Sequence, residues 1–351
     1  MEPAVRGALI QVRSDASNER MGFMSELRWG ILSTATIGRT KVIPAMQAAD
    51  RCRVVGIASR EVNAAKRVAD ELSIPSAFSS YEELLSSDDI DAVYIPLPNH
   101  LHAEWTIAAA RAGKHVLCEK PLALNLAQAR EMAEVCAEEG VKLMEAFMYR
   151  LHPSWVAVRE MLASGRIGEL CAVQSWFSYF NEDPRNIRNI ADAGGGALYD
   201  IGCYNVNLSR MLFGSEPRVV GASVTRDPEL HVDVLTSAML KFNDGVADFT
   251  CSTRAEPDQR VHIYGSEGRI SIGIPFNIPT NLPTKVFVTA GGDPPVAVHM
   301  ETLTFAPANQ YTIQAELFAR AALDDEPLPI SIEDAIANME VIDRTFELGD
   351  R

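Results

Sequence analysis

Residues 29–38 of this chain read Trp29-Gly30-Ile31-Leu32-Ser33-Thr34-Ala35-Thr36-Ile37-Gly38, which is an apolar strand, a turn and a helix start. A dinucleotide-binding turn would have three glycines, where Ser33, Ala35 and Gly38 stand here. Only Gly38, at the position that serves close packing of the helix on the strand, is a glycine. Ser33 and Ala35 are small enough for backbone N–H groups to approach a pyrophosphate at the helix N-terminus. Taken alone, the stretch fits an ordinary strand-to-helix turn equally well.

The end of the next strand narrows the choice of ligand. A unit that binds NAD has an acidic residue some 20 positions on, roughly where this chain reads Ala58-Ser59-Arg60-Glu61. A hydroxyl and a guanidinium suit a ribose 2′-phosphate, and Arg60 can also stack on an adenine. The alternative is that Arg60 is a solvated residue at a helix start and that Glu61 binds the ribose. We favour the first interpretation, which predicts NADP rather than NAD.

Around this stretch, short apolar runs alternate with helical patterns as far as about Tyr149. Near-continuous apolar strands are typical of a parallel sheet that is covered on both faces. The predicted strands are Leu27–Ser33, Val54–Ser59, Ala92–Pro96, His115–Glu119 and Lys142–Phe147. The predicted helices are Val62–Leu72, Tyr81–Ser86, His102–Ala112 and Leu126–Glu139. The pattern predicts a doubly wound α/β domain over residues 27–150.

The rhythm changes after about His152, where longer strand candidates have alternating or mixed faces and turn residues between them. These strands are Leu170–Tyr179, Arg218–Thr225, Asp233–Phe242, Val246–Ser252, Arg260–Tyr264 and Arg269–Ile274. Predicted helices are Pro153–Ser164, Gly196–Met211, Tyr311–Leu323 and Ile332–Glu347, the last with Ser331 as its N-cap. We therefore expect a second, α+β domain over residues 151–347, with an open, mostly antiparallel sheet.

Composition and charge exclude several classes of protein. The 351 residues suffice for two domains, and 47% of them are hydrophobic. A net charge of −15 argues against a nucleic-acid partner, which would need the opposite sign. No apolar run approaches the roughly 18 residues that cross a bilayer, so we expect no membrane partner. The six cysteines are scattered without metal-ligand spacing, which suits buried thiols in a reducing cytoplasm.

Residues 1–26 mix charged residues of both signs and contain no apolar segment of the kind that a signal peptide needs. We expect a flexible N-terminal arm there. An arm that wraps a cofactor or a partner is the alternative.

Lys120 and Tyr204 are the candidate catalytic residues. Lys120 follows a buried strand at the sheet edge where ligands bind in open α/β folds. Asp200 and Tyr204 are four residues apart and share one face of a predicted helix. A phenol is a natural proton donor or acceptor for a carbinol, and a nearby ammonium would lower its pKa. The alternatives are that Lys120 pairs with its neighbour Glu119, and that Tyr204 is an ordinary core residue.

Three motifs together resemble the Gfo/Idh/MocA oxidoreductase family. They are Pro98–His102, with the pattern P-N-x-x-H, Glu119-Lys120-Pro121, and the run Gly194–Tyr204, which reads G-G-G-A-L-x-D-I-G-x-Y. The last two, in this order and about 75 residues apart, are specific together, whereas each alone is not. Tyrosine at position 204 and the stretch Glu145–Arg150 are most similar to three subgroups. These are the glucose–fructose and aldose–aldose oxidoreductases, the D-xylose dehydrogenases and the dimeric dihydrodiol dehydrogenases.

The resemblance implies a substrate site between the two domains, with Lys120 beside a nicotinamide and often before a cis proline bond. The cofactor contacts implied are Ser33, Thr34, Ala35, Ile37, Gly38, Ser59, Arg60, Pro96, Leu97, Asn99, His102, Glu119, Lys120 and Arg188. Asp200, Tyr179, Lys120 and Tyr204 are the expected substrate contacts, with Asn186 or Arg188 as a helper. Trp176, Phe177, Tyr179 and Phe180 are the expected aromatic walls.

From these residues we expect NADP-dependent oxidation of the C1 hydroxyl of a pyranose aldose to a lactone, alone or coupled to reduction of a second sugar. No metal is required. The alternatives on the same scaffold are a trans-dihydrodiol dehydrogenase and a keto-sugar reductase. A rival of another class is a non-catalytic NADP-binding regulator, against which the presence of both Lys120 and Tyr204 argues.

The open sheet also predicts assembly. A sheet face that its own helices leave uncovered would expose a large apolar patch, which monomers avoid. We expect Val234, Thr236, Ala238, Leu240 and their neighbours to supply that face, and a homodimer or a dimer of dimers to cover it.

Overall fold

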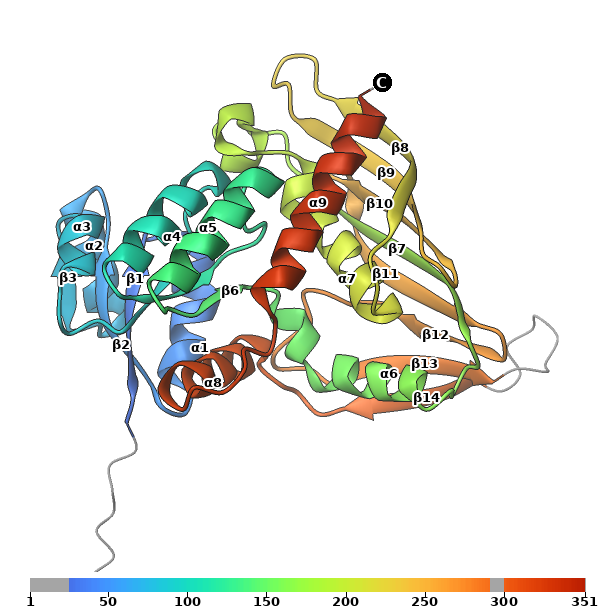
Figure 1. Ribbon diagram of the computed structural model, residues 1–351, viewed down its shortest axis with the longest axis horizontal. Helices are drawn as coiled ribbons and strands as arrows, with labels where there is room; N and C mark the ends of the chain where they lie inside the picture. Colours follow the sequence, from blue (N-terminus) through green and yellow to red (C-terminus); the bar gives the residue numbers. More distant parts are fainter. Residues whose placement is uncertain (1–24, 291–299, 351) are drawn as a thin grey trace, which may run out of the picture.

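The computed structural model describes residues 25–290 and 300–350 (Figure 1). The predicted N-terminal arm therefore lies almost wholly outside the described residues. Two sheets dominate the molecule, and helices lie between them and around them (Figure 1). Among the described residues, no helix is both long and apolar enough to span a membrane.

The first sheet is parallel throughout, with the strand order β3-β2-β1-β4-β5-β6. Its strands are β1 (Leu27–Leu32), β2 (Cys52–Ala58), β3 (Ser76–Phe78), β4 (Ala92–Ile95), β5 (His115–Cys118) and β6 (Leu143–Glu145). The sequence predicted all of these except β3, whose three residues are too few to show a pattern. The strand order reverses between β1 and β4, which opens a crevice at the carboxyl ends of the strands.

The helices of the first part of the chain are α1 (Ile43–Gln47), α2 (Val62–Leu72), α3 (Tyr81–Leu85), α4 (His102–Arg111) and α5 (Leu126–Glu138). Helix α8 (Gln310–Leu323) returns from the far end of the chain to pack on this sheet, where Phe318 lies 5.1 Å from the ring of Trp29. Helix α9 (Ile332–Gly349) contacts α5 on one side and the second sheet on the other (Figure 1). Its N-cap is Ser331, whose hydroxyl accepts the N–H of Asp334, as predicted.

The second sheet has eight strands in the order β14-β13-β12-β11-β7-β10-β9-β8. They are β7 (Leu170–Phe180), β8 (Arg218–Arg226), β9 (Asp233–Lys241), β10 (Val246–Ser252), β11 (Arg254–Gly265), β12 (Gly268–Ile272), β13 (Thr284–Ala290) and β14 (Met300–Phe305). All neighbours are antiparallel except β7 and β10, which run parallel. The sheet is therefore mixed but mostly antiparallel. Strands β13 and β14 were not predicted.

Helices α6 (Pro153–Ala163), α7 (Cys203–Phe213) and α9 contact this sheet. The prediction that Thr236, Ala238 and Leu240 line the uncovered face is wrong, because all three are buried within the chain. Their neighbour Met239 is 50% exposed instead. Side chains alternate between the two faces of a strand. Thr236, Ala238 and Leu240 therefore point toward the covered face of the sheet, and Met239 points toward the opposite face.

Candidate active site

A cavity of about 1160 Å³ lies at the carboxyl ends of the parallel strands and extends to the second sheet. It brings together most of the residues predicted from the sequence. Those that line it are Ser33, Ala35, Ile37, Arg60, Pro96, Leu97, Asn99, Glu119, Lys120, Tyr179, Arg188, Asp200 and Tyr204. Thr34, Gly38, Ser59 and His102 do not line it.

The turn after β1 suits a pyrophosphate. Ser33 has a φ of 137°, in the left-handed range that favours glycine, and its hydroxyl oxygen accepts the Ala35 N–H at 3.0 Å. The serine thus adopts the backbone conformation of the glycine that a dinucleotide-binding turn would have at this position. A side-chain carbon added to Gly38 would meet Pro96 and Tyr94 only at ordinary contact distance, 3.7 Å. Close packing of helix on strand therefore does not require glycine there.

Arg60 lies on the cavity wall, which also includes Tyr81, a residue of α3 that the motifs did not single out. Glu61, the alternative ribose ligand, is not among the lining residues. Ser59 is nearly buried, and its hydroxyl accepts the N–H of Glu61 at 3.3 Å. A guanidinium on the cavity wall suits an adenine ribose that carries a phosphate.

Lys120 is paired with Asp200 rather than with Glu119. Its Nζ donates to the Asp200 carbonyl at 2.6 Å and to Oδ1 at 3.3 Å. The Glu119 carboxylate instead accepts the Tyr94 hydroxyl at 2.6 Å. The peptide bond from Lys120 to Pro121 is cis, in agreement with the resemblance.

Asp200 is bound by three side chains at once. Besides Lys120, the Tyr179 hydroxyl and Arg188 Nε donate to its Oδ2 at 2.6 and 2.9 Å. Burial alone would raise the pKa of Asp200, but Lys120 and Arg188 outweigh it and lower that pKa to about 2. The pKa of Lys120 is raised in turn, since Asp200 opposes the effect of burial. Lys120 and Asp200 therefore form an ion pair that stays charged at neutral pH.

A local irregularity positions Asp200. Residues Leu198–Gly202 form a π-helical turn before α7, of the kind often found at functional sites. The carboxylate of Asp233, from β9, accepts the Leu198 N–H at 2.7 Å and thus caps this turn from a distant strand. Gly196, with a φ of 126°, is required there, because a Cβ would lie 2.0 Å from the Asp233 carboxylate.

Tyr204 lies in the cavity wall with Lys120 Nζ 5.0 Å above its ring. Among the described residues, its hydroxyl makes one hydrogen bond, to Met148 Sδ at 3.9 Å. The expectation that Lys120 lowers the pKa of Tyr204 is wrong. Burial, with a contribution from the Glu119 charge, raises that pKa well above 10.

The prediction that the His102 side chain contacts the cofactor is wrong, because His102 does not line the cavity. Its ring is fully buried below the cavity, with Nδ1 2.9 Å from the Pro121 carbonyl and Nε2 2.9 Å from the Leu97 carbonyl. Burial lowers the pKa of His102 to about 4. The residue therefore joins two loops of the cavity wall from behind instead of contacting a cofactor.

Two of the four expected aromatic walls are in place. Phe177 and Tyr179 line the cavity, whereas Trp176 and Phe180 do not. Lining residues that the sequence analysis missed come from segments far apart in the chain. They include Tyr81, Met148, Ser178, Asp258, Gln259, Asn277 and Tyr311. Only Met148 lies within a stretch that the motifs singled out.

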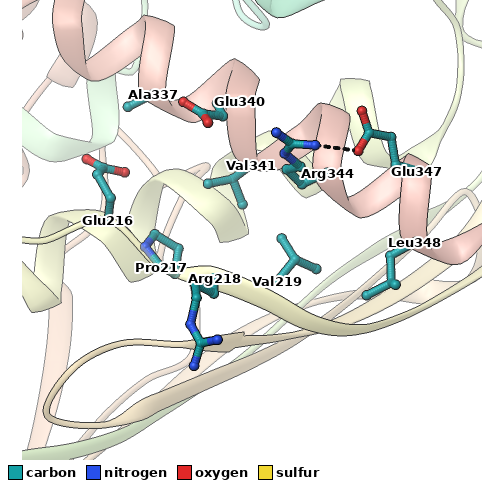
Figure 2. Close-up of a pocket in the computed structure, with 10 residues that line it drawn as sticks. All are labelled: Glu216, Pro217, Arg218, Val219, Ala337, Glu340, Val341, Arg344, Glu347 and Leu348. Carbon is teal, nitrogen blue, oxygen red and sulfur yellow. Dashed lines mark hydrogen bonds and ion pairs between the residues drawn. The ribbon is translucent and has the colours of Figure 1, made fainter.

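A second cavity of about 410 Å³ lies between α9 and the start of β8 (Figure 2). Its wall carries charges of both signs, and Arg344 donates to Glu347 at 2.8 Å along α9 (Figure 2). None of the residues predicted from the motifs lines this cavity. The large cavity is therefore the candidate active site.

Comparison with known proteins agrees with the two-part fold. Residues 27–147 match the NAD-binding Rossmann fold of the Gfo/Idh/MocA oxidoreductase family, and residues 155–271 match the family's C-terminal domain. The chain belongs to the Gfo/Idh/MocA oxidoreductases, which are enzymes that bind NAD(P).

Three relatives are similar over most or much of their length. D-xylose 1-dehydrogenase (NADP(+)) 2 of Haloferax volcanii is 39% identical over 324 residues, 92% of this chain and 97% of its own. Trans-1,2-dihydrobenzene-1,2-diol dehydrogenase of Mus musculus is 35% identical over 251 residues, 70% of this chain and 74% of its own. The crystal structure of a 3-ketoreductase from Actinomadura kijaniata with NADP and TDP-benzene superimposes with a TM-score of 0.86. That structure is 33% identical and covers 92% of this chain and 98% of its own.

Proposed function

We propose that this protein is an NADP-dependent sugar dehydrogenase that oxidises the C1 hydroxyl of a pyranose aldose to a lactone. The observation that carries the proposal is the placement of Lys120, Asp200 and Tyr204 around one cavity at the carboxyl edge of the parallel sheet. The similarity to a xylose dehydrogenase whose name includes NADP(+) supports both the sugar and the cofactor. The residues fit a dinucleotide, since the Ser33 turn and Arg60 lie at the end of the cavity that the parallel strands form.

A bound nicotinamide would supply the hydride acceptor, and the chain's own residues do the rest. The Lys120 ammonium, kept charged by Asp200, holds the substrate oxygen and stabilises negative charge on it. Tyr204 faces the same space and exchanges the proton of that oxygen. Tyr179 and Arg188 keep Asp200 in place, so the ammonium does not swing away.

A keto-sugar reductase is the second candidate, and one observation favours it. The raised pKa of Tyr204 means that the phenol keeps its proton at neutral pH, which suits donation to a carbonyl oxygen during reduction. Oxidation needs the proton to leave, so its rate should rise with pH. The similarity to a 3-ketoreductase is consistent with this second candidate.

The test is a substrate panel. Purified protein is mixed with aldoses and NADP at pH 7 and pH 9, with keto-sugars and NADPH, and with trans-dihydrodiols, and the nicotinamide absorbance is followed. Turnover of an aldose to a lactone supports the first proposal. Turnover of only a keto-sugar or a diol selects an alternative, and cofactor binding without any turnover supports a non-catalytic regulator.

Arg60→Ala should weaken binding of NADP far more than binding of NAD. Loss of one charge-assisted contact to the 2′-phosphate should reduce the difference in binding free energy between NADP and NAD by roughly 1–3 kcal/mol. Dissociation constants for both cofactors, measured by titration of wild type and variant, check this. A wild-type protein that prefers NAD contradicts the assignment of Arg60.

We further propose a homodimer or a dimer of dimers that pairs through the outer face of the second sheet, where Met239 and Val220 are 50% and 47% exposed. Met239→Lys should shift the mass toward that of one 38.4 kDa chain, because a buried unpaired charge opposes association. Leu282→Lys, at an equally exposed position outside the strands, is the control. Light scattering at micromolar concentration measures the mass, and a monomeric wild type contradicts the proposal.

A further inference from the structure

One peptide unit directly after Lys120 is held at both polar ends by buried side chains. The carbonyl of Pro121 faces His102 Nδ1 at 2.9 Å, and the N–H of Leu122 donates to Glu145 Oε1 at 2.8 Å. His102, Leu122 and Glu145 are each 0% exposed. Because carbonyl and N–H belong to the same rigid peptide plane, these two contacts fix the direction in which the chain leaves Lys120.

Glu145 is the more unusual partner, since a carboxyl group with no exposure is costly to bury. It ends β6 and is paired with Cys118 at the end of β5, two residues before Lys120. Its Oε1 binds Leu122, while its Oε2 has no hydrogen-bond partner among the described residues. An apolar side chain would fill this position without that cost. The feature that only a polar group supplies is the bond to Leu122.

The charge state of Glu145 is consistent with a neutral acceptor. Burial and the charge of Asp334 raise its pKa to about 8, against the opposing effects of the Leu122 bond, Arg210 and Arg150. The raised pKa favours the protonated form of Glu145, whose carbonyl oxygen accepts the Leu122 N–H. A glutamine presents the same carbonyl oxygen with nearly the same shape.

We propose that Glu145 is a positioning residue for Lys120. By holding the peptide unit 121–122, it keeps the ammonium 2.6 Å from the Asp200 carbonyl and above the Tyr204 ring. Glu145 does not line the cavity and acts only through Lys120. The proposal rests on the proposed function, since it requires that Lys120 take part in the reaction.

Two variants separate positioning from folding. Glu145→Gln keeps the acceptor and should keep kcat within about threefold of wild type. Glu145→Leu removes the acceptor and should lower kcat roughly ten- to a hundred-fold, the scale of a misplacement of about 1 Å. NADP affinity, measured by fluorescence titration, should change less than about threefold in both, because the phosphate-binding residues lie elsewhere in the cavity.

His152→Leu is the matched control, because the His152 side chain is equally buried and its Nε2 has no hydrogen-bond partner among the described residues. Its Nδ1 bonds only Ser154, at the start of α6. This variant should lower the melting temperature and leave kcat per folded molecule unchanged.

A double-mutant cycle with Lys120→Met then tests whether Glu145 acts through Lys120. If Glu145 acts through Lys120, Glu145→Leu should cause no further loss of kcat in the Lys120→Met protein. Losses that multiply in the double variant overturn the proposal, as does a Glu145→Leu protein with normal kcat and a lowered melting temperature. A Lys120→Met protein with normal kcat overturns the proposed function instead, and so distinguishes the two failures. Where Glu145→Leu does not fold, Glu145→Gln still tests the proposal, because it keeps the acceptor for the Leu122 N–H. A fall of more than about tenfold in its kcat would show that this bond is not what positions Lys120.

Discussion

Replacing Lys120 with methionine is expected to reduce kcat by roughly a hundred- to a thousand-fold, the effect of removing a preorganised donor from a developing oxyanion. Methionine keeps most of the length and packing of the side chain but leaves Asp200 without its main positive partner. NADP affinity should change much less, since the phosphate-binding residues lie elsewhere in the cavity. Steady-state turnover and a fluorescence titration of the cofactor, on the same preparation, measure the two effects.

Lys114 provides the control for this variant. It is also a lysine of the first part of the chain, 8% exposed, and its Nζ donates to the Ser87 and Ile90 carbonyls at 2.9 Å. Lys114→Met should lower the melting temperature and leave turnover per folded molecule intact. If both variants lose stability and neither loses turnover, Lys120 is a structural lysine and the proposed chemistry is wrong.

Tyr204→Phe should reduce turnover by roughly a hundred- to ten-thousand-fold, the usual contribution of general acid–base catalysis. Phenylalanine keeps the ring among its aromatic neighbours, whose centroids lie 5.2 to 5.9 Å away, and removes only the hydroxyl. Because the pKa of Tyr204 is raised, wild-type oxidation should accelerate as the pH increases from 6 to about 10. The Phe variant should lose this acceleration. Profiles of kcat against pH in the oxidative direction test both statements.

Tyr149→Phe is the matched control, because Tyr149 belongs to the same aromatic cluster and is fully buried outside the cavity wall. Its hydroxyl donates to Asn207 Oδ1 at 2.7 Å, so its loss leaves a buried acceptor unpaired and costs about 1–3 kcal/mol of stability. Turnover per folded Tyr149→Phe molecule should stay near that of wild type. Near-normal turnover in Tyr204→Phe would instead make Tyr204 a core tyrosine like Tyr149.

Local patterns predicted most of the secondary structure. The helix at Val62–Leu72 was predicted with the bounds that the structure shows, and the strand at Val246–Ser252 likewise. Both have a complete periodic pattern within their own length, so no distant segment is needed to define them. The parallel pairing of β7 with β10 was not predicted, since it joins segments that the whole of α7 and two strands separate in sequence.

The site likewise contains residues that the motifs predicted and residues that only the structure brings in. The motifs predicted that Lys120, Asp200 and Tyr204 lie in one site, and all three line the same cavity. Strand ends and helix starts are recognisable in sequence, and the family resemblance places these two segments at one site. The contributions of Tyr81, Asp258 and Tyr311 were missed, because they follow no motif and come from other elements. His102 was assigned to the cofactor on its motif, yet its ring is buried between two carbonyls.

By itself, the sequence determined the order of most elements, the two kinds of sheet and the identity of Lys120, Asp200 and Arg188 at the site. These properties depend on side-chain periodicity and on local backbone preference, which a few neighbouring residues settle. Only the tertiary structure decided which face of β9 is covered, which atom of Asp200 Lys120 binds, and how Tyr204 titrates. Burial and the direction of a neighbouring charge set a pKa, and both depend on residues that are far away in the sequence. Lys120 Nζ lies 5.0 Å above the ring of Tyr204, yet burial and the charge of Glu119 raise the pKa of the phenol, so it stays protonated at neutral pH.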